Sequence, residues 1–359
     1  MSAPPTEPEA TPATRSGYTG NEIQPDEFVG TLLLVDSAAA SEADLNDGDS
    51  AFGDGLSSSS SSLSSDVTDF REFNNRRYHA FQENQYWLPN DDEEISRLEL
   101  QHIVWRLCLN GRLHIAPVPA DVHRVIDLGT GTGKWAIEFA DMHPSAEVIG
   151  TDLSPIQPNS LPSNCSFIVD NVEEEWVYSE PFDYIHSRML CLGIHDWKKY
   201  FQQCWDNLKP GGWMEVQETK FPLMSADGKG PSESAFLQWS QYIKEAAAND
   251  GIDADPTQRF RGMLEDIGFI DIREQPLQWP IGGWPKGERE KIIGRIMIDN
   301  LRQFYKPSAM ALYTKRLGWT VEQVEEFLPS VLKDLEDRTQ HYYVQMHIVA
   351  ARKPDIESS

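Results

Sequence analysis

Residues 122–142 read VHRVIDLGTGTGKWAIEFADM, and this stretch determines the fold class of the chain. Val122–Leu128 has the apolar composition of a buried strand, and Lys134–Met142 has the spacing of a helix. Between them lies a glycine-rich loop, Gly129–Gly133. Glycines let the backbone approach a ligand closely, and the N-terminus of the following helix offers unpaired N–H groups and positive potential. The stretch therefore predicts a strand–loop–helix unit that binds a ligand carrying negative charge.

Strands and helices continue to alternate beyond this unit. Val148–Thr151, Phe167–Val169 and Phe182–His186 read as strands, and Trp197–Leu208 reads as a helix with one apolar face. Alternation of this kind indicates a parallel sheet with right-handed crossovers. The remaining pattern predicts a tight turn at 209–212, strands at 213–217 and 269–279, helices at 232–248, 257–266, 287–304, 309–317 and 321–335, and a final edge strand at 341–351.

Two acidic residues follow strands at positions that suit a nucleoside. Asp152 closes the second strand, 19 positions after Gly133, where a carboxylate can accept hydrogen bonds from both ribose hydroxyls. Asp170 ends the third strand, where it can accept a hydrogen bond from an adenine amino group. Simpler roles exist for both residues, as a turn cap for Asp152 and as an ordinary loop residue for Asp170. Together with the glycine loop, they predict a nucleoside-containing cofactor.

The glycine spacing argues against one class of nucleoside-binding enzyme, the dinucleotide-binding enzymes. Dinucleotide-binding enzymes usually carry GxGxxG. Here 129–133 reads GxGxG, with Asp127 two positions before the first glycine, and no Tyr-x-x-x-Lys pair stands in a suitable helix. The sequence therefore disfavours an NAD-dependent oxidoreductase.

Several segments resemble a known family. They are 129–133, 148–156 (VIGTDLSPI), 170–176 (DNVEEEW), 182–188 (FDYIHSR) and 208–212 (LKPGG). Together they resemble class I S-adenosylmethionine-dependent methyltransferases and, more narrowly, the fungal LaeA-like family. The upstream segment 92–117, with Glu94, Arg97, Gln101 and His102, is similar to the helices that precede the domain in that family.

The resemblance spans about residues 70–353 and implies a fold and a domain organisation. The expected fold is α/β and Rossmann-like, with a mostly parallel seven-stranded sheet, helices on both faces, N-terminal helices and inserted C-terminal helices. We predict a disordered acidic tail over 1–70, a helical lid segment over 71–120, and a methyltransferase domain over 121–353 with a helical insertion at about 285–338.

The resemblance also assigns roles to the cofactor-binding candidates. Gly129, Gly131 and Gly133 would border the methionine part of S-adenosylmethionine, Asp152 the ribose and Asp170 the adenine. Asp127 would orient the loop or meet the methionine amino group. Trp176 would flank the adenine or belong to the core.

No catalytic residue can be assigned from the sequence. In methyl transfer the cofactor supplies an activated methyl group, so the protein mainly aligns the reactants and sometimes provides a base. His186 and His195 are the candidates for that base, and a structural hydrogen bond is the alternative for each. Glu218 either contacts the substrate or lies exposed at a strand end. Trp279, Trp284 and Tyr305 either wall an acceptor pocket or belong to the core.

Composition excludes several other functions. The 359 residues contain 31 Lys and Arg against 57 Asp and Glu, a net charge of −26, which disfavours nucleic acid and anionic membranes as partners. Cys108, Cys165, Cys191 and Cys204 lack zinc-site spacing, so we expect no metal and no disulfides. The N-terminus has no signal-peptide pattern, which predicts a cytoplasmic protein, with the nucleus as the alternative.

The N-terminal segment 1–70 carries 13 acidic residues and one basic residue. Its Ser- and Pro-rich composition is typical of disorder. Phe28–Val35 is a short apolar stretch that is either incidental or a docking peptide for a regulatory protein partner. Two functions therefore remain open: methylation of a small-molecule acceptor in fungal secondary metabolism, or a regulatory role exerted through protein partners.

Overall fold

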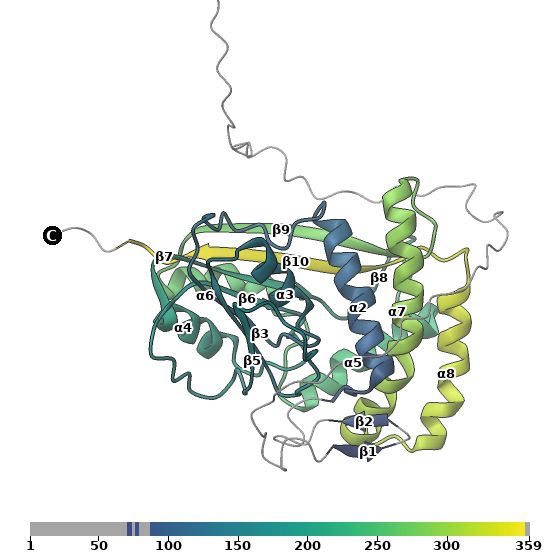
Figure 1. Ribbon diagram of the computed structural model, residues 1–359. Helices are drawn as coiled ribbons and strands as arrows, with labels where there is room; N and C mark the ends of the chain where they lie inside the picture. The colour runs from purple at the N-terminus through teal and green to yellow at the C-terminus, as the bar shows by residue number, and fades with distance from the viewer. Residues whose placement is uncertain (1–69, 74–75, 79–86, 356–359) are drawn as a thin grey trace, which may run out of the picture.

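The computed structural model describes residues 70–73, 76–78 and 87–355 (Figure 1). The predicted disordered tail, with Phe28–Val35, lies outside the described residues except for Phe70. Within the described part, no helix combines the length and the apolar character needed to cross a bilayer. The four cysteines form no disulfide with one another.

Five parallel strands form the centre of the main sheet. They are β3 (Arg124–Leu128), β4 (Glu147–Asp152), β5 (Cys165–Val169), β6 (Phe182–Arg188) and β7 (Leu208–Thr219), in the spatial order β5-β4-β3-β6-β7. Ile126 of β3 lies between Ile149 of β4 and Ile185 of β6, and all three side chains are buried. Such apolar strands are expected where helices cover both faces of a sheet. The strand order reverses beside β3, and open α/β sheets bind ligands at the carboxyl ends of the strands at that point.

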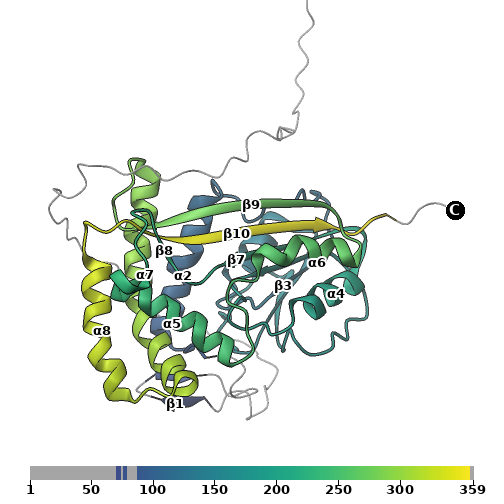
Figure 2. The same ribbon diagram turned by 180° about the vertical axis from the view of Figure 1, so that it is seen from behind.

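Helices cover the two faces with separate apolar clusters. On one face, α4 (Trp197–Asn207) and α6 (Phe260–Ile267) pack through Phe201, Cys204 and Phe260 (Figure 2). On the other face, α3 (Lys134–Met142) contributes Trp135 and Phe139 to the larger cluster. These layers confirm the predicted α/β architecture.

The antiparallel side of the sheet corrects one prediction. Strand β10 (Tyr342–Arg352) was expected at the edge, but it lies between β7 and β9 (Ile270–Ile281) and also pairs with the short β8 (Met224–Ser225). The strand at this edge of the sheet is β9, which carries Pro276 and Pro280. Proline cannot donate a ladder hydrogen bond and is therefore confined to sheet edges. In the described residues the main sheet has eight strands instead of seven, because β8 adds two residues beside β10.

The predicted turn at 209–212 is also different in the structure. These residues already belong to β7, which starts at Leu208. Strand pairing with β6 shifts register between Phe182 and Tyr184, and the Gly211 N–H donates to the Lys353 carbonyl at 2.9 Å. The glycines thus form an irregular start of the strand, because residues that follow β10 supply hydrogen-bond partners that the local pattern does not reveal.

A group of helices stands at one end of the sheet. It consists of α2 (Asp92–Cys108), α5 (Ala235–Asn249), α7 (Glu288–Leu312) and α8 (Val321–Glu336), with α2 beside α7 in Figure 1. Along the chain, helices α7 and α8 come after β9 and before β10, in the region where the insertion was predicted. The break expected between 304 and 309 is absent, since α7 continues through Pro307. The Ser308 hydroxyl donates to the Phe304 carbonyl at 2.7 Å, one position after the proline, which lacks the N–H group of a regular helical turn.

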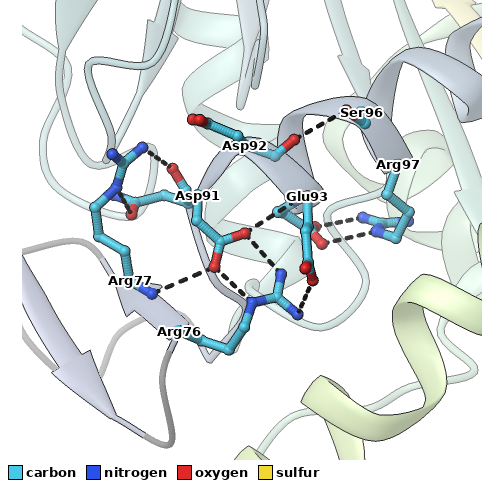
Figure 3. A network of polar contacts seen from close by, with 9 residues as sticks. Arg76, Arg77, Asp91, Asp92, Glu93, Ser96 and Arg97 are labelled. Carbon is cyan, nitrogen blue, oxygen red and sulfur yellow. Dashed lines mark hydrogen bonds and ion pairs between the residues drawn. The ribbon is translucent and has the colours of Figure 1, made fainter.

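The segment predicted as helical over 71–120 contains a hairpin before its helix. Strands β1 (Arg71–Phe73) and β2 (Arg76–Tyr78) pair antiparallel. The Arg76 guanidinium contacts both carboxylate oxygens of Asp91, at 2.5 and 2.7 Å (Figure 3). Asp91 also caps α2 by accepting from the Glu94 N–H at 3.1 Å. The hairpin therefore holds the N-terminus of α2 in place.

Candidate functional site

A cavity opens at the carboxyl ends of the parallel strands. Its volume is about 870 Å³, including its opening to solvent. Strand-end residues, the glycine loop and the start of α2 line it: Pro89, Asn90, Glu94, Leu98, Gly129, Gly131, Asp152, Leu153, Ser154, Ile156, Asp170, Asn171, Val172, Arg188, Met189, Leu190, Gly193 and Ile194. Two of the three predicted aspartates, Asp152 and Asp170, and two of the three predicted glycines therefore lie in one site, which we call the first cavity.

Asp152 is anchored by the backbone on both sides. Its two carboxylate oxygens accept from the Gly131 N–H at 2.8 Å and from the Ser154 N–H at 3.0 Å. Burial raises the pKa of this carboxyl to about 6, although these N–H bonds act in the opposite direction. A carboxylate held in this way can still accept further hydrogen bonds from a ligand's hydroxyl groups.

The glycines of the loop have two different tasks. Gly129 and Gly131 line the first cavity, and both have positive φ angles, 64° and 58°. Gly133 does not belong to the lining and caps α3 with a φ of 76°. A Cβ atom there would lie 2.4 Å from the ring of Phe167. Gly133 is thus required for close packing of the loop against β5, not for contact with a ligand in the first cavity.

Asp127 and His186 form a buried pair behind the loop. The carboxylate of Asp127 contacts His186 Nδ1 at 2.7 Å and accepts from the Thr130 hydroxyl at 2.5 Å. Both side chains are buried, and neither lines the first cavity. The imidazole stacks on Trp135 with ring centres 3.8 Å apart. In this arrangement Asp127 contacts the loop through Thr130, and His186 contacts Asp127 instead of lining the first cavity.

His195 and Trp176 also lie outside the lining of the first cavity. The His195 ring contacts the carboxylate of Glu173 at 2.7 Å at the surface. The Trp176 indole donates to the Val172 carbonyl at 2.9 Å and packs against the α4–α6 cluster. Asp170 does line the first cavity, with one oxygen accepting from the Asn171 N–H at 2.8 Å.

The positive side chain in the first cavity is Arg188, at the end of β6. Burial lowers the pKa of its guanidinium to about 10, and Asp127 and Glu138 partly offset that effect. Its Nη2 lies 3.1 Å from His102 Nδ1. Burial and the nearby Arg188 lower the pKa of His102 to about 3, so the imidazole is neutral and can accept from the guanidinium.

A second, largely apolar cavity adjoins the first. Its volume is about 640 Å³, again including its opening. It is lined by Leu88, Arg97, Gln101, Met189, Cys191, Leu192, Thr219, Phe221, Leu223, Trp239, Trp279, Met297, Asn300, Leu301, Phe304, Val344 and Met346. Met189 lines both cavities, so they meet at that residue.

One of the three predicted aromatic wall residues lies in this second cavity. Trp279 belongs to the lining, whereas Trp284 is buried and donates to the Tyr342 carbonyl at 3.1 Å. Tyr305 is outside the lining, and its neighbour Phe304 is inside. The helical period turns adjacent residues in different directions, so the sequence could not tell which of the two faces the cavity.

Glu218 has a role that neither sequence hypothesis described. It is fully buried and accepts from the Leu190 N–H at 2.9 Å and the Cys191 N–H at 3.0 Å. Burial raises its pKa to about 8. The loop that it holds contributes Met189 to both cavities. Glu218 therefore positions the wall between the cavities without lining either of them.

Comparison with known proteins identifies the family. Residues 98–274 match the family described as methyltransferase domain. The methyltransferase pytC of Aspergillus terreus is 36% identical over 83% of this chain and 92% of its own length. The probable methyltransferase tdiE of Emericella nidulans is 32% identical over 73% and 83% of the two chains, respectively. The secondary metabolism regulator LAE1 of Cochliobolus heterostrophus is 34% identical over 78% and 94%.

The chain belongs to the LaeA-like family of class I methyltransferases. It is an S-adenosylmethionine-dependent methyltransferase, and its relatives include proteins named secondary metabolism regulators. The first cavity suits that cofactor, because glycine backbone forms part of its wall and a Cβ at Gly129 would lie 2.4 Å from Leu190. Asp152 and Asp170 supply carboxylate acceptors at its rim. When bound, S-adenosylmethionine supplies the activated methyl group.

Proposed function

We propose that this methyltransferase acts on a small-molecule acceptor bound in the second cavity. The observation that carries the proposal is the meeting of the two cavities at Met189, which gives a cofactor and an acceptor a shared boundary. Gly129, Gly131, Asp152 and Asp170 hold the cofactor in this proposal. Apolar side chains such as Leu301 and Val344 bury the acceptor and exclude water.

The contribution of the protein is mainly alignment. Holding two reactants in a productive geometry can replace much of the entropic cost of their encounter. Glu218 holds the loop 190–191 through two backbone hydrogen bonds, so the boundary at Met189 has a defined position. His186 and His195 stay outside both cavities and supply no proton transfer in this proposal.

The test uses S-adenosylmethionine with a deuterated methyl group and a small-molecule extract of a filamentous fungus. We expect the purified full-length chain to add a labelled methyl group to at least one extract component, detected by mass spectrometry. Leu301→Trp and Val344→Phe, which fill the second cavity, should abolish the product while leaving cofactor affinity unchanged. Equal product from wild type and both variants would contradict an acceptor in the second cavity.

A matched control variant weakens cofactor binding and leaves the second cavity unfilled. Asp152→Ala leaves the Gly131 and Ser154 N–H groups without their acceptor. We expect it to weaken S-adenosylmethionine binding by about 2–3 kcal/mol, the scale for unpaired buried polar groups. Calorimetric titration measures this, with NADH as the control ligand that should not bind. An unchanged dissociation constant would remove Asp152 from the cofactor site.

The second candidate function is regulatory. It rests on the relatives named secondary metabolism regulators, such as LAE1 of Cochliobolus heterostrophus. In that case the chain would act through a protein partner, in the cytoplasm or the nucleus, and the acidic segment 1–70 would be the docking element. Affinity capture with the full-length chain and with a chain lacking residues 1–69 tests this. A partner retained only by the full-length chain supports the regulatory role, and identical capture by both contradicts docking by the tail.

A further inference from the structure

An ion pair on the first turns of α2 separates the two cavities. The Arg97 guanidinium donates to Glu94 through Nε at 2.9 Å and through Nη2 at 2.6 Å. Both residues are buried, at 2% exposure for Glu94 and 4% for Arg97. Glu94 lines the first cavity, and Arg97 lines the second. In Figure 3, Arg97 lies apart from the ion pairs that Arg76 forms with Asp91 and Glu93.

Stability alone does not account for this pair. Bringing two charges out of water costs about as much as their attraction returns, and apolar residues of similar volume are often at least as stable in such positions. The pair is nevertheless held firmly, because the Asn300 side chain of α7 donates to the Arg97 carbonyl at 2.8 Å. The guanidinium also lies 5.1 Å from the ring centre of Phe304, which lines the same cavity.

Arg97 is the one charged side chain among the described residues that line the second cavity, and Gln101, Thr219 and Asn300 are neutral. Cys191 stays a thiol because burial raises the pKa of its side chain well above the ordinary value. The described lining residues include no histidine and no carboxylate. This lining therefore favours an acceptor whose nucleophile has already lost its proton.

We propose that the acceptor of the second cavity is a planar, apolar anion, either a phenolate or the enolate of an acidic enol, whose oxyanion lies against Arg97. This inference rests on the proposed function. An oxyanion forms charge-assisted hydrogen bonds with a guanidinium, which are stronger in an apolar cavity than in water. The flat apolar body of the acceptor suits the walls formed by Trp239, Trp279 and Phe304.

The reaction balances without a base. A lone pair of the acceptor oxygen forms the new bond to the methyl carbon, and the carbon–sulfur bond breaks with its electron pair remaining on sulfur. The oxyanion becomes a neutral ether, the sulfonium becomes a neutral thioether, and no proton moves. Before transfer, the cation of the cofactor would lie in the first cavity, which Glu94 lines. The anion of the acceptor would lie in the second cavity, which Arg97 lines. After transfer the acceptor oxygen is uncharged, so the attraction between this oxygen and the Arg97 guanidinium is lost.

Two fluorescent probes test the charge preference without knowledge of the natural acceptor. The first is 8-anilinonaphthalene-1-sulfonate, an aromatic anion, and the second is its uncharged counterpart N-phenyl-1-naphthylamine. Both are titrated into the full-length chain, and binding that persists in Leu301→Trp is subtracted as binding outside the second cavity. We expect the wild-type cavity to bind the anion about tenfold more tightly than the neutral probe, the scale of a hydrogen bond to a charged group.

Two variants of similar shape should change this preference in opposite directions. Glu94→Gln removes the carboxylate that offsets Arg97, so affinity for the anion should rise about tenfold while the neutral probe is unaffected. The double variant Glu94→Gln/Arg97→Met removes both charges, and the two probes should then bind equally. Thermal melts establish that each variant is folded, and Glu94→Gln alone still decides the question if the double variant unfolds.

Three results would overturn the proposal. They are an anion preference that the double variant retains, an anion affinity that does not rise in Glu94→Gln, and the absence of any probe binding that Leu301→Trp removes. A labelled product from the fungal extract together with one of these results would leave the small-molecule methyltransferase intact and refute only the anionic acceptor. Correct probe behaviour without any labelled product would refute the proposed function instead.

Discussion

Three carboxylates at or near the ends of strands β3, β4 and β7 have different roles because they meet different partners. Asp127 contacts His186 and the Thr130 hydroxyl behind the loop. Asp152 accepts from two backbone N–H groups and faces the first cavity. Glu218 also accepts from two backbone N–H groups, but it holds a loop instead of facing a cavity. Their similar positions in the sheet do not determine which of them meets a ligand.

The raised pKa of Asp152 predicts a pH dependence of cofactor binding. Burial places this pKa at about 6, so the carboxylate is ionised above that pH and protonated below it. Protonation uses one oxygen that would otherwise accept a ribose hydroxyl. We expect the dissociation constant for S-adenosylmethionine to be constant from about pH 7 upward and to rise up to about tenfold per pH unit below pH 6. Asp152→Ala should remove this dependence in calorimetric titrations, and an identical pH profile in that variant would assign it to another group.

Substitution of Gly133 should destabilise the protein more than substitution of another glycine with a similar backbone conformation. A side chain there is strained by the φ of 76° and collides with Phe167. Gly111 has a similar φ of 80°, but an added Cβ would meet nothing within 4 Å. We expect Gly111→Ala to lower the free energy of unfolding by about 1 kcal/mol and Gly133→Ala by about 3 kcal/mol in urea titrations. Equal losses would show that the ring of Phe167 moves aside without cost.

At the scale of elements, the start of α2 connects the hairpin, the first cavity and the second cavity. Asp91 caps the helix and contacts Arg76 of β2, which lowers the pKa of the aspartate. One turn later, Glu94 and Arg97 face different cavities. Asn90, just before the cap, donates to the Ser154 hydroxyl at 3.3 Å and lines the first cavity. The position of this helix end therefore sets the geometry of both cavities.

Two substitutions separate the cap from the ion pair. Asp91→Ala removes both, and we expect it to lower the free energy of unfolding by about 1–2 kcal/mol and to weaken cofactor binding, because Asn90 and Glu94 lose their support. Arg76→Ala removes only the half-buried ion pair and should cost below about 1 kcal/mol. Chemical denaturation and cofactor titration of both variants measure this. A larger loss in Arg76→Ala than in Asp91→Ala would contradict the importance of the cap.

At the scale of the whole molecule, the two cavities are built from segments far apart in the chain. Their lining residues extend from Leu88 to Met346, and α2, α5, α7, β9 and β10 all contribute to the second cavity. The lining residues that the structure describes all follow residue 70, whereas residues 1–70 carry −12 of the total net charge of −26.

Removal of the acidic segment tests whether it contributes to the site. A chain lacking residues 1–69 retains every described residue that lines a cavity and the hairpin that supports α2. We expect its dissociation constant for S-adenosylmethionine to stay within about twofold of the full-length value, because this chain keeps the residues that hold the cofactor in the proposed function. The same titration on both chains provides the comparison, and a loss of tenfold or more would place part of the segment at the site.

Local sequence patterns were enough to predict the parallel sheet, the glycine loop and the position of Asp152 and Asp170 at the carboxyl edge of the sheet. These features depend on residues close together in the chain, and a parallel sheet brings its strand ends to one edge whatever the details of packing. Tertiary structure decided the rest: that Asp127 and His186 pair behind the loop, that β10 lies inside the sheet, and that Glu94 and Arg97 face different cavities. In each case the deciding partner is distant in sequence, and packing between elements selects it, so no local pattern could indicate it.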